Sequence, residues 1–219
     1  LKIRKYLFKD SQKKYKKFVF ISNQNFANVL SFFILFKINW IKQILIERNH
    51  IDEFKIETNF SRKIKNFFIL LCIKIFYKYA DVVIGISKKL STDLSNFSSS
   101  KVKTIYNPAF DKKIFKFGGV KILEKFKKKK FILNVSRLTK QKDHITLLKA
   151  FKIISEKISI DLIIVGYGSE IKQINNFIKK NNLKKKVHVL TNVSNPFPFY
   201  KIAKVFVLTS KYEGFGNVL

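Results

Sequence analysis

Short runs of β-branched and aromatic residues alternate with longer segments of helical spacing throughout the chain. In the first half, strands are predicted at residues 18–22, 43–47, 81–87 and 102–106. Helices are predicted between them, at residues 25–37, 62–79 and 88–96. Strands that alternate with helices form a parallel sheet covered by helices. The pattern therefore predicts an α/β fold.

The helix predicted at residues 62–79 has a clear apolar stripe. Its apolar side chains recur at helical spacing with lysines between them, at Ile64, Phe67, Phe68, Leu71 and Ile75. An amphipathic helix of a globular domain packs such a stripe against the core. We therefore expect these side chains to be buried.

The same alternation returns in the second half, after a lysine-rich interval that contains Gly118 and Gly119. Strands are predicted there at residues 131–136, 161–166, 187–190 and 205–210. Helices are predicted at residues 143–157, 169–181 and 196–203. The interval marks a boundary, so we expect a first domain at 1–112, a linker at 113–130 and a second domain at 131–219.

The composition excludes an intrinsically disordered chain. The 219 residues are 47% hydrophobic and 15% aromatic, which is enough for one large or two small cores. Cys72 is the only cysteine and cannot form an internal disulfide, which favours a reducing cytoplasm. The sequence has no methionine, begins with Leu1 and stops where another helix should begin. We therefore expect a fragment that lacks both ends.

The formal net charge is +31, from 45 Lys and Arg against 14 Asp and Glu. Such an excess suggests nucleic acid or an anionic membrane surface as partner. Nearly all the cations are lysines spread along the chain, whereas phosphate and base recognition favours arginine, so we do not expect nucleic acid. The apolar runs at 26–36 and 67–76 are shorter than the ~20 residues of a spanning helix. Residues that favour a membrane surface instead are Lys13, Lys14, Lys16, Lys17, Phe32, Phe33 and Phe36.

Candidate chemistry lies in the loops after the predicted strands, because ligands of parallel sheets bind at the carboxyl ends of the strands. Arg137 and Lys142 flank the loop that leads into the helix predicted at 143–157. Two cations beside the orphan N–H groups of a helix start form a site for a diphosphate. The alternative is that both are ordinary surface cations. His144 is interpreted as a helix-start residue without a chemical task.

Two further loops contain glycines. Gly166 and Gly168 lie at a strand-to-helix turn, where a backbone can approach a phosphate or sugar closely. Ile171 replaces the third glycine of the dinucleotide fingerprint, so we do not expect a nicotinamide or flavin cofactor. Glu213 precedes Gly214 on a later loop and can accept hydrogen bonds from hydroxyl groups. The alternative for Glu213 is the cap of a following helix.

The order and spacing of these loops resemble the second domain of family 4 glycosyltransferases. The matching segments are residues 134–138, 141–142, 150–151, 163–168 and 210–216. In the first half, residues 79–87 and 102–108 resemble the segments that close that family's first domain. The resemblance implies the GT-B fold, which is an α/β fold with two Rossmann-like domains facing across a cleft. Both domains would be incomplete in this chain.

The resemblance also implies roles for individual residues. Arg137 and Lys142 would hold the diphosphate of the donor and offset the charge on the departing nucleotide, and Glu213 would contact the donor sugar. These three are the expected catalytic residues. Glu213 matches the first glutamate of the family's Glu-x7-Glu motif, and the second would fall beyond Leu219. The expected donor-binding residues are Gly166, Gly168, Gly214, Phe215, Gly216 and Asn217.

The first domain departs from the commonest family pattern. Many members place a histidine opposite the donor sugar, just after the strand that here ends at Glu47. This sequence continues with Arg48 and Asn49, and so is similar to the branch of the family with a Ser-Glu-Arg-Asn type of loop. We therefore expect Arg48 and Asn49, rather than His50, in the cleft.

The resemblance implies a retaining glycosyltransferase that moves a sugar from a nucleotide-diphosphate sugar to a glycan or lipid-linked acceptor. The sequence has no Asp-x-Asp pair and no His/Cys cluster to hold a metal, so we expect neither a metal nor a cofactor besides the donor. Surface polysaccharide or glycolipid synthesis is the expected process, in the cytoplasm and at the inner face of the membrane. Two alternatives stay open, namely an inactive or truncated relative with a binding role, and a nucleic-acid-binding protein.

Overall fold

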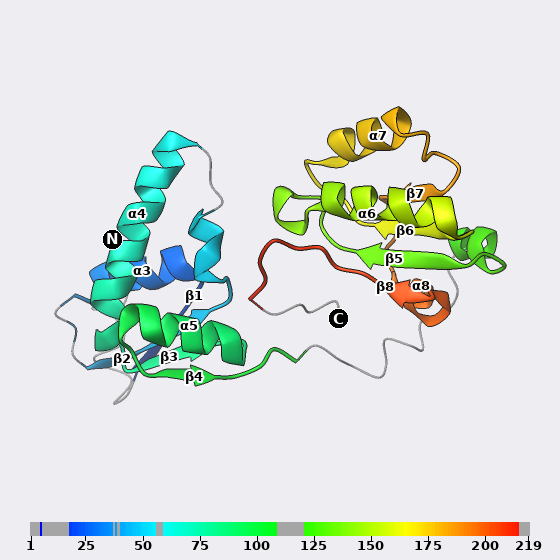
Figure 1. The fold of residues 1–219 in the computed structure, drawn as a ribbon. Coiled ribbons are helices and arrows are strands. Elements are labelled where there is room, and N and C mark those ends of the chain that lie inside the picture. The colour runs from blue at the N-terminus through cyan, green and yellow to red at the C-terminus, as the bar shows by residue number, and fades with distance from the viewer. Residues whose placement is uncertain are drawn as a thin grey trace. The chain divides into compact units, whose positions relative to one another are not determined.

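The structure is a computed structural model that describes residues 5, 18–36, 38, 40–55, 59–108 and 121–214. The chain divides into two compact units. The first comprises Leu1–Pro108 together with Glu213–Gly216, and the second comprises Ala109–Tyr212 together with Asn217–Leu219. Each unit contains a four-stranded parallel sheet with helices packed on it (Figure 1). The predicted α/β class is therefore confirmed.

The first unit has the strand order β1-β2-β3-β4. Its strands are β1 (Phe18–Asn23), β2 (Ile41–Glu47), β3 (Val82–Gly85) and β4 (Val102–Thr104). All neighbouring pairs are parallel, so the carboxyl ends of the strands meet at one edge of the sheet. The loops after β2 and β3 therefore lie at the edge where ligands of parallel sheets bind.

Three α-helices connect these strands. They are α3 (Asn25–Leu35), α4 (Phe60–Phe76) and α5 (Lys88–Ser98), and two short 3-10 helices accompany them, η2 (Ile51–Lys55) and η3 (Tyr77–Tyr79). Side-chain caps fix where two of the helices begin. The carboxamide oxygen of Asn59 accepts from the backbone N–H of Ser61 at 3.1 Å, and the hydroxyl of Ser87 accepts from that of Leu90 at 3.3 Å.

The apolar stripe predicted to be buried on α4 is exposed, so that prediction is wrong. Phe67 and Phe68 are 63% and 58% exposed, and Ile64, Leu71 and Ile75 are exposed as well. The helix packs on the core through Ile69 and Ile73, and Tyr77 of η3 continues this set at four-residue spacing. Because α4 is apolar on two faces, periodicity alone did not indicate which face packs.

The second unit has the strand order β7-β6-β5-β8, again with parallel pairs. Its strands are β5 (Phe131–Val135), β6 (Asp161–Val165), β7 (Val187–Leu190) and β8 (Val205–Phe206). Its α-helices are α6 (His144–Lys157), α7 (Ile171–Lys180) and α8 (Phe197–Ile202), and its 3-10 helices are η5 (Lys121–Phe126) and η6 (Lys140–Lys142). β8 is shorter than the strand predicted at 205–210, although the N–H of Val207 still donates to the carbonyl of Leu133 at 2.8 Å.

Two apolar clusters cover the two faces of the second sheet. Leu162 and Ile164 of β6 pack in the cluster that contains α6 and α7, whereas Ile163 and Val165 pack in the cluster that contains α8. This alternation follows from the two-residue repeat of a strand buried on both faces. Phe126 of η5 is also buried in the second cluster. The described part of the predicted linker therefore contributes to the core of the second unit.

Candidate functional site

Arg137 and Lys142 lie on the loop between β5 and α6, which the structure describes completely. Leu138 is fully buried and anchors the loop, whereas Arg137 is exposed and Lys142 is half-buried. Asp143 ends the loop in a left-handed conformation, and its carboxylate caps α6 by accepting from the N–H of Thr146 at 3.4 Å. The loop therefore presents one cation near each of its ends, close to the start of a helix.

Gly166 and Gly168 pack against this loop backbone to backbone. A Cβ atom on Gly166 would overlap the carbonyl oxygen of Ser136, and one on Gly168 would overlap that of Leu138. Both glycines also have positive φ values, 154° and 157°. The N–H of Leu138 donates to the carbonyl of Tyr167 at 2.8 Å. In this structure both glycines bring the loop after β6 into contact with the loop that carries the two cations.

A network of buried polar side chains, formed by Asn134, Ser136 and His144, holds the same loop in place. The Nε2 atom of His144 lies 3.0 Å from the hydroxyl of Ser136 and 3.2 Å from the carboxamide oxygen of Asn134. The amide of Asn134 donates to the carbonyl of Val207 at 2.8 Å. The pKa of His144 is lowered to about 4, mainly by burial; the nearby charge of Asp143 opposes this shift, and that of Lys142 adds to it. His144 is therefore neutral at pH 7 and joins β5, α6 and the segment after β8.

The segment after β8 lies along the same loop. The hydroxyl of Thr209 donates to the carbonyls of Lys142 and Asp143, both at 3.1 Å. The N–H of Lys211 donates to the carbonyl of Gln141 at 2.8 Å, and the amide of Gln141 donates to the carbonyl of Tyr212 at 3.0 Å. These contacts fix the segment beside Lys142. They could not be inferred from the sequence, because they join residues about seventy positions apart.

Glu213 and Gly214 group with the first unit. The hydroxyl of Ser87 donates to the carbonyl of Gly214 at 2.6 Å, and a Cβ atom on Gly214 would overlap the carbonyl oxygen of Arg48. Glu213 is half-buried. Gly214 thus lies against the loops that follow β2 and β3. The other expected donor-binding residues of this segment, Phe215, Gly216 and Asn217, lie outside the described residues.

Arg48 and Asn49 directly follow Glu47, the last residue of β2, and both are half-buried. The carboxylate of Glu47 is 3% exposed and accepts a hydrogen bond from the N–H of Arg48 at 3.2 Å. Its other oxygen accepts from the hydroxyl of Tyr77 at 2.9 Å and from the amide of Asn28 at 3.3 Å. Burial raises the pKa of Glu47 to about 7, although these hydrogen bonds act in the opposite direction.

His50 is buried and holds the far side of this loop. Its Nε2 atom lies 2.7 Å from the carboxylate of Asp93 on α5, and its Nδ1 atom accepts from the N–H of Asp52 at 3.2 Å. His50 thus joins η2 to α5. The loop after β2 is consequently fixed at both ends, by Glu47 before Arg48 and by His50 after Asn49.

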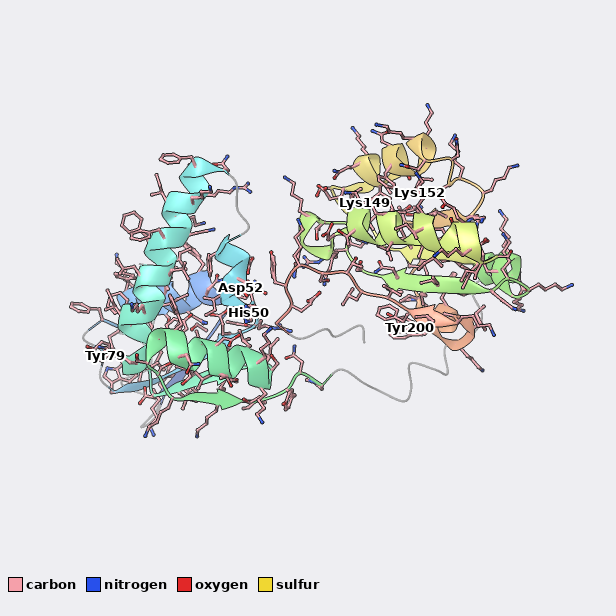
Figure 2. All side chains as sticks on the ribbon, viewed as in Figure 1. His50, Asp52, Tyr79, Lys149, Lys152 and Tyr200 are labelled. Carbon is pink, nitrogen blue, oxygen red and sulfur yellow. The ribbon has the colours of Figure 1, made fainter. Side chains whose placement is uncertain are left out.

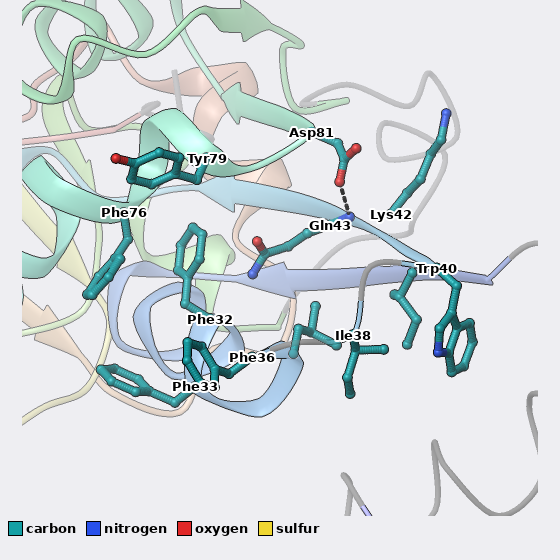
Figure 3. Close-up of a pocket in the computed structure, with 12 residues that line it drawn as sticks. Phe32, Phe33, Phe36, Ile38, Trp40, Lys42, Gln43, Phe76, Tyr79 and Asp81 are labelled. Carbon is teal, nitrogen blue, oxygen red and sulfur yellow. Dashed lines mark hydrogen bonds between the residues drawn. The ribbon is translucent and has the colours of Figure 1, made fainter.

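The first unit also has a pocket of about 830 Å³ that is separate from these loops. Figure 3 shows Phe32, Phe36 and Trp40 on its aromatic wall. The pocket lies at the amino end of β2, where the N–H of Gln43 donates to the carboxylate of Asp81 at 2.8 Å. It is therefore at the end of the strand opposite to Arg48.

The structure brings the described candidate residues together in two groups, one in each unit. In the second unit these are Arg137, Lys142, Gly166 and Gly168. In the first unit they are Arg48, Asn49, Glu213 and Gly214. The loop with Arg137 and Lys142 has the donor groups that suit a phosphate anion. Within the described ranges, there is no group of three or more His, Cys, Asp or Glu side chains that could hold a metal ion.

Comparisons with known proteins agree with this architecture. Residues 120–219 match the family model described as glycosyl transferases group 1. The uncharacterized glycosyltransferase MJ1059 of Methanocaldococcus jannaschii is 34% identical over 194 residues, which are 84% of this chain and 47% of that protein. A Campylobacter jejuni enzyme is 35% identical over 167 residues, which are 74% of this chain and 43% of that protein. Its name is N-acetylgalactosamine-N,N'-diacetylbacillosaminyl-diphospho-undecaprenol 4-alpha-N-acetylgalactosaminyltransferase.

The structural comparison extends over almost the whole chain. The crystal structure of Anabaena Alr3699/HepE in complex with UDP-glucose matches with a TM-score of 0.74 and 18% identity, over 99% of this chain and 58% of that one. A likeness at this identity shows the fold, which is the predicted GT-B fold. The chain spans about half the length of the curated relatives it matches. Each unit has a parallel sheet covered by helices, the second half matches the family model, and MJ1059 is 34% identical. The chain therefore belongs to the group 1 glycosyltransferases.

Proposed function

We propose that the protein containing this chain is a retaining glycosyltransferase that uses a nucleotide-diphosphate sugar as donor. One observation carries the proposal. Arg137 and Lys142 lie on one loop at the start of α6, and that loop is fixed by Gly166, Gly168 and the buried His144. A rigid loop with two cations is pre-organised for the negative charge that builds up when a nucleoside diphosphate leaves.

In the proposed mechanism, Arg137 and Lys142 hold the diphosphate and stabilise the charge on the leaving group. These cations would supply the charge neutralisation that a divalent metal supplies in other transferases. We assign contacts with the hydroxyl groups of the donor sugar to Glu213, because a carboxylate accepts hydrogen bonds from hydroxyls. Gly214 would contribute backbone groups to the same donor site. No cofactor besides the donor is included in the proposal.

We assign five more residues to the donor site. Phe215, Gly216 and Asn217 continue the segment that follows Glu213. Arg48 and Asn49 are proposed for the acceptor-side wall, because Arg48 lies against Gly214 in the first unit. Gly166 and Gly168 are assigned an indirect role, since each makes close contact with the cation-bearing loop.

The relatives suggest the chemical class of both substrates. HepE was crystallised with UDP-glucose, which supports a uridine-diphosphate sugar as the first donor to test. The name of the Campylobacter jejuni relative includes a diphospho-undecaprenol-linked sugar, which supports a lipid-linked glycan as acceptor. We therefore propose surface polysaccharide or glycolipid synthesis as the process, on the cytoplasmic side of the membrane.

Steady-state kinetics of the full-length protein test this function. Arg137→Ala and Lys142→Ala are each expected to lower kcat/KM for sugar transfer by about 10²-fold to 10³-fold. Lys149→Ala is the matched control, because Lys149 is an exposed lysine on α6 away from the loop (Figure 2). The anomeric configuration of the product, read by NMR, is expected to be that of the donor. Wild-type rates in both loop variants would rule out the diphosphate assignment.

The same assay separates transfer from a purely binding role. An active transferase is expected to form product in the presence of a metal chelator. A protein that is stabilised by uridine diphosphate in a thermal shift but forms no product would instead be an inactive relative with a binding role. A product with inverted configuration would contradict the retaining mechanism.

A further inference from the structure

Helix α4 has a second apolar face that is exposed. Its packed face, Ile69 and Ile73, is covered by the core of the first unit. The opposite face consists of large apolar side chains that are all exposed, from Phe60 at 77% through Ile64, Phe67, Phe68, Leu71 and Ile75. Figure 2 shows side chains projecting outward along the length of this helix. Their spacing of three and four residues makes one continuous stripe.

Helix α3 extends this apolar surface. Its exposed residues are Phe26, Leu30 and Phe33. The ring of Phe33 contacts that of Phe76 on α4, with 5.8 Å between ring centroids. The ammonium group of Lys65 on α4 lies 4.8 Å from the ring centroid of Phe26. We call the exposed apolar residues of the two helices the α3–α4 face. An exposed patch of this kind marks an interaction site.

The charges on these two helices all have one sign. α3 has no charged residue, and the charged residues of α4 are the cations Arg62, Lys63, Lys65 and Lys74. Lys78 follows directly after the helix, and residues 60–80 include no Asp or Glu. Long lysine side chains can keep their charge at a polar boundary while their stems cover apolar surface. An apolar stripe on a helix whose own charged residues are all cations is complementary to an anionic lipid surface.

We propose that the α3–α4 face docks on an anionic lipid bilayer, with α4 lying along the interface. The apolar stripe would enter the boundary between headgroups and acyl chains, and the lysines would bind the headgroup phosphates. The described helices fall short of the length and apolarity needed to cross a membrane, so the proposed mode is surface binding. This inference concerns a surface remote from Arg137 and Lys142 in the sequence, and it does not rest on the transferase mechanism.

The structure changes which residues of the first half form the proposed surface. Phe33 and Phe36 are exposed as a membrane surface requires. Phe32 instead packs inward, where its ring stacks on Phe76 and Tyr77 with centroid distances of 5.5 and 6.3 Å. The lysines at positions 13, 14, 16 and 17 lie outside the described residues. The exposed stripe of α4 therefore forms the larger part of the described surface.

Vesicle co-sedimentation of the full-length protein tests the proposal. The protein is expected to bind vesicles that contain phosphatidylglycerol and to stay in solution with pure phosphatidylcholine. Lys63→Gln with Lys74→Gln is expected to weaken binding roughly 30-fold, from about fivefold for each lysine near the surface. Phe67→Ser with Phe68→Ser is expected to weaken it by at least about 10-fold. Both pairs are exposed, so the folded state should persist in each.

Two variants in the second unit are matched controls. Lys149→Gln removes an exposed lysine from α6, and Ile153→Ser removes an apolar side chain that is 60% exposed on the same helix. Both are expected to bind vesicles as the wild type does. Binding of uridine diphosphate in solution is expected to be unchanged in all four variants, so a failure of this proposal is distinguishable from a failure of the proposed function.

Four results would overturn the proposal. Equal binding to neutral and anionic vesicles, or wild-type binding by both surface pairs, would exclude docking through this face. No binding to either vesicle would show that the α3–α4 face does not dock on a bilayer. Light scattering could instead detect a dimer that becomes a monomer in the variant Phe67→Ser with Phe68→Ser. That result would show that the α3–α4 face binds a second copy of the chain.

Discussion

The hydroxyl of Tyr77 donates a 2.9 Å hydrogen bond to the carboxylate of Glu47, although thirty residues separate the two. Both side chains are buried, and Glu47 is the last residue of β2. Its carboxylate also accepts from the N–H of Arg48. The pair therefore fixes the start of the loop that we assign to the acceptor-side wall of the donor site.

Glu47→Gln should change how stability depends on pH. The pKa of Glu47 is raised from 4.5 to about 7, so the folded state binds more protons than the unfolded state between these values. The free energy of unfolding of the wild type should thus fall as pH rises from 4.5 to 7, by up to about 3 kcal/mol for this group. Urea unfolding at several pH values is expected to show a flatter profile for Glu47→Gln.

Glu156→Gln is the control for this change, because Glu156 is an exposed carboxylate on α6. It is expected to keep the wild-type profile. A Glu47→Gln profile parallel to that of the wild type would show that the buried carboxylate does not titrate in this range.

Tyr77→Phe should destabilise the protein while the ring keeps its packing against Phe32. The variant removes one hydrogen-bond donor from a buried carboxylate, which costs about 1–3 kcal/mol. The loss of stability should be larger above pH 7, because Glu47 is then charged and a missing hydrogen-bond donor costs a buried charge more. Chemical unfolding at about pH 5 and about pH 8 measures the difference. Tyr79→Phe, at a position that is 70% exposed, should have no effect at either pH.

Gly166→Ala and Gly168→Ala should each disturb the cation-bearing loop. An added methyl group would overlap the carbonyl oxygen of Ser136 or Leu138, and each position has a positive φ that disfavours a side chain. We expect a loss of about 1–3 kcal/mol in the free energy of unfolding. Tyr167→Ala lies between the two glycines and is 72% exposed, so its unfolding free energy should stay at the wild-type value. Wild-type stability in both glycine variants would contradict the packing described for the two loops.

His144 should give the opposite pH dependence to Glu47. Its pKa is lowered from 6.5 to about 4, so the unfolded state binds more protons between these values. Stability should consequently fall as pH drops from 6.5 to 4, by up to about 3 kcal/mol for this group. Differential scanning calorimetry should find that His144→Gln loses less stability on acidification than the wild type does. If the variant loses as much stability as the wild type between pH 6.5 and 4, His144 does not titrate in this way.

The sequence predicted the elements better than their packing. The strands at 43–47 and 161–166 and the helix at 143–157 were recognisable because each has one simple period. The packed side of α4 was not, because the helix is apolar on two faces and only the tertiary structure selects Ile69 and Ile73. Periodicity reports an apolar face and carries no information about what covers it.

In the candidate site, too, the sequence predicted local features but not the contacts between distant residues. The sequence indicated Gly166 and Gly168 as a close-approach turn, yet their partners are the carbonyls of Ser136 and Leu138, which only the folded chain brings there. The buried carboxylate of Glu47 was treated as the end of a strand, since its donors lie on distant elements. Contacts between residues far apart in the chain are set by the sheet order, and no local pattern encodes them.

Equilibrium binding of uridine diphosphate and of uridine, measured by calorimetry on the full-length protein, tests the central claim most directly. If the loop of Arg137 and Lys142 holds the diphosphate, Arg137→Ala should weaken binding of uridine diphosphate by about 10-fold to 100-fold. Its affinity for uridine should not change, because uridine has no phosphate. Wild-type affinity of Arg137→Ala for uridine diphosphate, or an equal loss for both ligands, would contradict the assignment.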